Sequence, residues 1–293
     1  MKCPNPIVVA LAAAALFACH REGNGPGVPP PPKAQEDRPP TAAHAPVSLP
    51  RPPAGPPVAE EVASELAKDK AAFARLPDEE QARFRRLVDE AGQVLRKYKP
   101  RKALALLNEA RRLRAIDHDL LLFRGLAWMQ LREHETACRY FERGLRYYPE
   151  FTPLQFNLAE CEFMRGRYAE SEALFAQTLG ERPELPLPTL RILEFKSLLC
   201  LLKLEQSEEA RRRIEAVVAD GTPFDRYAKA AWRLKAGPDD QARSLLASAR
   251  SVFTPAARIP YEESLIACGL IDGQLPPPPV EEDAPPGNPG EAE

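Results

Sequence analysis

The feature that most constrains this sequence is a pair of like segments within residues 118–185. Residues of matching type recur at a spacing of 34, in the pairs Gly125 and Ala159, Ala137 and Ser171, Phe141 and Phe175, and Pro149 and Pro183. A helical unit of that length cannot bury its apolar face alone, so it stacks on its neighbours. We therefore expect an all-α chain of stacked helix pairs between about residues 84 and 253.

The two segments resemble the tetratricopeptide repeat (TPR) family. That pattern is a large residue, Leu-Gly and Tyr on a first helix, then Ala and Phe on a second helix, and a closing Pro. The first copy supplies Leu121, Arg124, Gly125, Trp128, Ala137, Phe141 and Pro149, and the second supplies Gln155, Leu158, Ala159, Glu162, Ser171, Phe175 and Pro183. Arg124, Gln155 and Glu162 depart from the pattern. The resemblance implies a right-handed α-solenoid.

The spacing of apolar residues extends this pattern in both directions. Residues 84–117 read as a degenerate first repeat, and a five-residue insertion at 184–188 precedes helices at 189–204 and 207–219. A last pair is expected at 224–236 and 239–253. We expect about five TPR-like helix pairs, flanked by a helix near 58–75 and by a short cap helix at 260–270. The folded domain then spans residues 58–272.

The two ends of the chain have a different composition. Residues 1–18 carry Lys2 and a short apolar run, the pattern of an export signal. Leu16 to Cys19 resemble a bacterial lipobox, which implies lipidation of Cys19 and a membrane anchor; the alternative is a secretory signal cut nearby. Residues 19–57 are a Pro-rich segment expected to be a disordered tether, and 273–293 an acidic Pro-rich disordered tail.

The lipobox resemblance implies a location, and the TPR resemblance implies a binding surface. His20 after Cys19 favours the outer over the inner membrane, on the periplasmic side, with secretion as the alternative. The first helices of stacked TPR pairs line a concave groove that holds peptides. The residues expected to line it are Leu122, Leu126, Met129, Phe156, Glu160, Phe163, Phe195 and Leu199, followed by Leu202, Tyr227 and Leu234. These side chains are mainly apolar, so the groove is expected to take a peptide or helix of a partner protein. The alternative is that they are core, or are covered by residues 58–75 or another part of the chain.

Signals for chemistry are few. The sequence contains no HExxH, Gly-rich phosphate loop, GxSxG or paired-cysteine metal motif. We therefore expect no enzyme, no cofactor and no metal. Cys138, Cys161, Cys200 and Cys268 are expected to be buried thiols, and a disulfide between Cys161 and Cys200 is disfavoured because the axes of stacked first helices lie too far apart.

Charge is uneven along the chain. Residues 83–114 carry eleven basic side chains against three acidic ones. In an exported protein this favours anionic lipid, a cell-wall polymer or the acidic tail over nucleic acid; the alternative is a solvated face. The sequence thus predicts a non-catalytic interaction module of the envelope. An envelope assembly factor or pilotin-like carrier, a structural spacer, and an enzyme subunit whose active site lies on a partner chain remain open, as does the oligomeric state.

Overall fold

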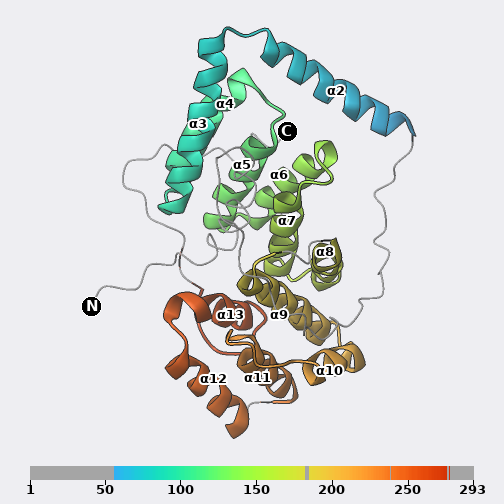
Figure 1. The fold of residues 1–293 in the computed structure, drawn as a ribbon, viewed down its shortest axis with the longest axis vertical. Coiled ribbons are helices and arrows are strands. Elements are labelled where there is room, and N and C mark those ends of the chain that lie inside the picture. Colours follow the sequence, from blue (N-terminus) through green and yellow to red (C-terminus); the bar gives the residue numbers. More distant parts are fainter. Residues whose placement is uncertain (1–55, 182–184, 238, 276, 278–293) are drawn as a thin grey trace, which may run out of the picture.

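The computed structural model describes residues 56–181, 185–237, 239–275 and 277, and this part of the chain is all-helical (Figure 1). The helices are α2 (Pro56–Ala74), α3 (Asp78–Arg96), α4 (Pro100–Leu113), α5 (His118–Gln130), α6 (His134–Tyr147), α7 (Thr152–Met164), α8 (Tyr168–Glu181), α9 (Leu187–Lys203), α10 (Ser207–Glu215), α11 (Phe224–Ala236), α12 (Asp240–Val252) and α13 (Pro255–Ala267). The predicted signal peptide, Cys19, almost all of the tether and most of the tail lie outside these residues. None of the described helices combines the length and hydropathy needed to cross a bilayer.

Successive helices pack against each other along the chain. The main contacts within pairs are α3 with α4, α5 with α6, α7 with α8, and α11 with α12, while α4, α6 and α8 also pack on the first helix of the following pair. Figure 1 shows the helices following one another down the long axis of the molecule, from α3 and α4 to α11 and α12. Each pair therefore buries a face that its neighbour leaves bare.

One turn geometry closes the first helix of four pairs. Its central residue has a positive φ angle, at Tyr98 (58°), Arg132 (66°), Gly166 (74°) and Glu205 (60°). The next amide in each case donates five residues back, from Lys99 to Val94, Glu133 to Trp128, Arg167 to Glu162 and Gln206 to Leu201. This is the Schellman arrangement that ends α-helices. The turns are spaced by 34, 34 and 39 residues, so the predicted period and its five-residue insertion are both present in the backbone.

The small residues of the repeat are sites of close helix contact. A Cβ atom at Gly125 would lie 2.2 Å from the ring of Phe141, and one at Gly144 would lie 2.6 Å from Leu154. At the position equivalent to Ala137, the Ser171 hydroxyl donates to the carbonyl of Ala159 at 2.9 Å. Small side chains thus allow the first and second helices to approach, as the sequence indicates.

The three departures from the family pattern have polar partners. Arg124 is 2 % exposed, donates to Asn108 and to the Tyr140 hydroxyl, and its guanidinium lies 4.9 Å from the Tyr140 ring centroid. The other two departures, Gln155 and Glu162, lie in the second repeat and have partners close to them in the sequence. Gln155 donates to the carbonyl of Pro149 at 2.9 Å, and Glu162 accepts two hydrogen bonds from Arg165. Buried polar groups are tolerated where they are hydrogen-bonded in this way.

Helix α2 packs on the N-terminal part of the stack through the ring of Phe73, 5.1 Å from that of Phe84 on α3, and through a set of polar contacts. Asp69 accepts hydrogen bonds from the side chain of Arg114 and from the amides of Ala115 and Ile116, all at 3.1 Å. The Tyr147 hydroxyl donates to Glu65 at 2.6 Å. These polar contacts lie on α6 and the turn before α5, so α2 does not cover the predicted groove positions of α9.

Two boundaries at the C-terminal end differ from the prediction. Helix α10 ends at Glu215 rather than at 219, and α13 begins at Pro255 rather than at 260, with Pro260 inside it. Pro255 occupies the first turn, where its missing amide costs nothing, and this makes it the better start. Helix α13 also does more than cap the open end, because it packs on α9 and α11 as well as on α12.

Candidate partner-binding groove

The structure buries most of the side chains that the repeat register assigns to the groove. Leu122 and Met129 lie in the core cluster of α3–α7, and Phe156, Phe163, Phe195 and Leu199 lie in the cluster of α7–α13. Their exposed fractions run from 0 % to 9 %, whereas Leu126 and Leu234 are half-buried. In this structure they are packed in the core, as the alternative interpretation of the sequence allows. Burying large apolar side chains stabilises the fold by about 1.5–3 kcal/mol each, so the chain covers them. Their contact with a partner stays a prediction.

Helix α13 is part of what covers these positions. The ring of Tyr261 lies 5.0 Å from that of Phe195 and 5.2 Å from that of Tyr227, and Phe195 and Tyr227 are themselves 6.3 Å apart. In addition, the Tyr227 hydroxyl donates to Glu262 at 2.9 Å. Three aromatic rings from α9, α11 and α13 therefore form one packed group at the expected binding surface.

The segment after α13 extends this cover toward the start of the stack. Lys203 of α9 donates to the carbonyl of Cys268 at 3.1 Å. Burial raises the pKa of Tyr168 of α8 to about 12, and the nearby Cys268 adds to this rise. The C-terminal part of the described chain is thus fastened to α8 and α9 as well as to α11.

A buried charged group lies beside the aromatic one. Lys196 and Glu160 form an ion pair at 2.7 Å, with side chains 9 % and 7 % exposed. The Lys196 ammonium also lies 5.0 Å from the centroid of the Phe163 ring. Sequence analysis selected Glu160 but missed Lys196; the available signal was a single lysine within the apolar run of α9.

Glu263 of α13 interacts electrostatically with the Lys196–Glu160 pair. Burial raises the pKa of this carboxyl, while the positive charges of Lys196 and Arg132 oppose the rise and Glu160 adds to it. Glu160 Oε1 and Glu263 Oε2 are two of the seven buried side-chain polar atoms of the described residues that have no hydrogen-bond partner. Lys196 therefore interacts with the carboxylates of both Glu160 and Glu263, and Arg132 also interacts with Glu263, which ties α13 electrostatically to the stack.

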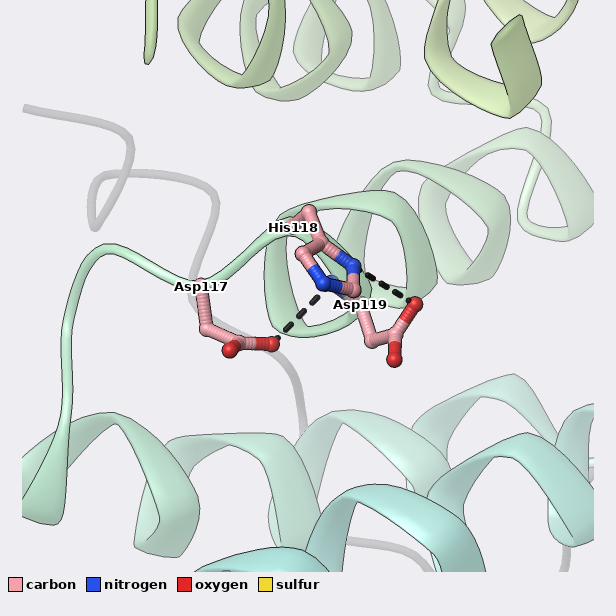
Figure 2. Close-up of side chains that lie close together, drawn as sticks. All are labelled: Asp117, His118 and Asp119. Carbon is pink, nitrogen blue, oxygen red and sulfur yellow. Dashed lines mark hydrogen bonds and ion pairs between the residues drawn. The ribbon is translucent and has the colours of Figure 1, made fainter. Parts of the chain in front are cut away.

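A second cluster, of Asp117, His118 and Asp119, lies at the start of α5 (Figure 2). Asp117 Oδ1 accepts from the amides of Asp119 and Leu120, at 3.0 and 3.2 Å, and its Oδ2 accepts from Arg114 at 2.6 Å. His118 Nδ1 contacts Asp119 Oδ1 at 3.0 Å. Burial lowers the pKa of His118, but the hydrogen bond and charges of the two aspartates outweigh it, so the net shift is upward.

These contacts account for the cluster as a helix cap. A metal ion at this place would compete with the Arg114 guanidinium for Asp117 and would face the positive end of the α5 dipole. The three side chains offer the donor atoms of a cation site, but the oxygens of Asp117 are already engaged. We assign the cluster to the local stability of α5.

A scan against protein-family models, a search of curated proteins and a search of solved structures each found no match. The resemblance to TPR proteins therefore rests on the sequence pattern and on the repeated turn alone.

Proposed function

We propose that this chain is a non-catalytic protein-interaction module, a right-handed α-solenoid of about five TPR-like helix pairs, fixed to the bacterial envelope by a lipid on Cys19. The support for the solenoid is the Schellman turn that recurs with the repeat period. The support for binding is the seat of α13 against α9 and α11. The proposed location is the periplasmic side of the envelope, on the outer rather than the inner membrane.

The chemistry of the contact between α13 and helices α9 and α11 supports one class of partner. Helix α13 presents Tyr261 and Leu265, which are 3 % and 0 % exposed, and Glu263 toward two cations. An aromatic ring at one position, a carboxylate two residues on and a leucine four residues on thus fit this surface. We infer that the partner supplies an amphipathic helix with this pattern, which takes the place of α13. A cargo of an envelope assembly factor or pilotin-like carrier would bind in the same way.

A structural spacer is the second candidate, favoured by the burial of the expected groove residues. The two candidates differ in whether α13 can be replaced. A resident helix has a high effective concentration and excludes a free one, whereas a weakened resident helix admits it.

The test uses a fluorescent peptide of residues 255–275 and the full chain. Fluorescence anisotropy is measured with the wild type, with Tyr261→Ala and with the control Ala256→Ser, which changes an exposed residue of the same helix. We expect the peptide to bind saturably to the Tyr261→Ala variant and not to the wild type or to Ala256→Ser. A peptide that lacks the side chains of both Tyr261 and Leu265 should not bind to any of the three proteins. Far-UV circular dichroism verifies that each variant is helical. Absence of binding to a folded Tyr261→Ala variant would favour the spacer.

Anchoring is tested separately in bacteria that express the full chain. Fractionation should place the wild type in membranes and Cys19→Ser in the soluble fraction, because one residue carries the proposed lipid. A Cys3→Ser variant is the control. Membrane retention of Cys19→Ser would contradict the anchor and leave the peptide experiment unaffected.

A further inference from the structure

Four buried cysteines of the described residues are free thiols, and two of them lie on the adjoining helices α6 and α7. Cys138 lies on α6 and Cys161 on α7, and their exposed fractions are 1 % and 0 %. The Cys161 thiol donates to the carbonyl of His134 at 3.0 Å. In an α-helix that carbonyl is also the acceptor for the amide of the residue four positions later, Cys138. The sulfur of Cys161 therefore lies beside the first turn of α6, next to Cys138.

The electrostatic contacts agree with this geometry. A hydrogen bond with Cys138, followed by burial, raises the pKa of the Cys161 thiol. Burial lowers the pKa of the Arg165 guanidinium, but the nearby Cys138 and Glu162 raise it overall. Arg165 is held by Glu162 of α7 and by Glu135 of α6, so it bridges the same two helices.

This pair differs from the one that sequence analysis considered. Cys200 contacts the Ser171 hydroxyl at 3.6 Å, on the contact between α8 and α9. Cys161 instead faces the preceding helix. The repeat register compares first helices with first helices, and so it overlooks a cysteine on the second helix of the previous pair.

We propose that Cys138 and Cys161 form an intramolecular disulfide that links α6 to α7. The oxidant is a disulfide, either of an oxidoreductase or of glutathione. The Cys138 thiolate attacks one sulfur of that disulfide, a mixed disulfide forms, and one thiolate of the oxidant leaves. The Cys161 thiolate then attacks the Cys138 sulfur and releases the second. Two protein thiols are oxidised, the oxidant is reduced to two thiols, and these take up the two protons.

Burial decides when this reaction takes place. Neither sulfur is accessible in the packed stack, so exchange belongs to folding, before α7 closes on α6. In the cell the link rests on the proposed export, because a reducing cytosol keeps thiols reduced. In the purified chain, formation of the link depends on the added oxidant and on the position of the two sulfurs, and not on export.

The test refolds the full chain from urea with oxidised glutathione, blocks the remaining thiols and maps the peptides by mass spectrometry. We expect a peptide that joins Cys138 to Cys161 in the wild type and in the matched control Cys200→Ser. The variants Cys138→Ser and Cys161→Ser should lack it. Free Cys138 and Cys161 after oxidation, or a link from either of them to another cysteine, would overturn the proposal.

Thermal unfolding provides a second measurement. A cross-link that closes a loop of this length stabilises the folded state, and for a domain of this size we expect the oxidised wild type to melt roughly 5–15 °C above the reduced protein. Cys200→Ser should show the same rise and Cys161→Ser none. A 138–161 link that lowers the Tm would count against the proposal, because it would show that the native α6–α7 contact does not accommodate the bond. Neither result depends on the peptide-binding experiment.

Discussion

The contact between Gly125 of α5 and Phe141 of α6 makes a quantitative prediction. An added Cβ atom would lie 2.2 Å from one ring carbon and 2.6 and 2.7 Å from two others. Ordinary contact begins near 3.4 Å, so the ring would have to move by more than about 1 Å, yet Phe141 is 0 % exposed. Overpacking typically costs about 1–3 kcal/mol, and a contact as short as 2.2 Å belongs at the upper end of that range. Alanine gains about 1 kcal/mol over glycine inside a helix, which offsets part of this cost. We expect Gly125→Ala to lose about 2 kcal/mol.

The matched control is Gly180→Ala in α8. Apart from the neighbouring residues and backbone of α8 itself, no atom of the described residues lies within 4 Å of the added Cβ, so the main change is in helix propensity and stability should rise by up to about 1 kcal/mol. Urea and thermal unfolding followed by circular dichroism measure both variants, and 2 kcal/mol corresponds to a fall of roughly 4–8 °C in Tm. If Gly125→Ala were as stable as the wild type, the close packing of α5 on α6 would be refuted.

Three further predictions concern single contacts. Glu205 has a φ of 60° and a side chain that is 82 % exposed. Because glycine adopts this conformation without strain, Glu205→Gly should raise the free energy of unfolding by about 1 kcal/mol. The control Arg212→Gly inside α10 should lower it by a similar amount, and urea unfolding compares the two variants. Lys196→Met leaves the buried Glu160 carboxylate without its cation and should lower the free energy of unfolding by about 3–5 kcal/mol. The double variant Lys196→Met with Glu160→Leu should recover most of that loss. Additive losses in a double-mutant cycle would contradict the ion pair. The raised pKa of His118 means that its protonation stabilises the fold below its unfolded pKa of about 6.5, and that this contribution disappears as pH rises through the folded pKa. His118→Gln should therefore destabilise the protein at pH 5.5 and have little effect at pH 8.5; the same loss at both pH values would show that the charge is not responsible.

The local pattern of residues determined the helices and their period. Glycine, alanine and serine at a spacing of 34 predicted where first and second helices approach, and the turns at Tyr98, Arg132, Gly166 and Glu205 keep that register through the insertion. Such features depend on residues a few positions apart, so the sequence alone contains them. Helix ends were less certain, as at α10 and α13, because neighbouring prolines offer alternative starts.

Tertiary structure decided which side chains are free to bind. Phe195 has the same residue type and register whether its ring faces a partner or Tyr261, because the element that covers it lies 66 residues later in the chain. The ion pair of Glu160 with Lys196, the approach of Glu263 and the facing of Cys138 and Cys161 likewise join separate helices. Burial and charge pairing depend on how helices meet in space, and periodicity within one helix does not record which helix comes to lie against it.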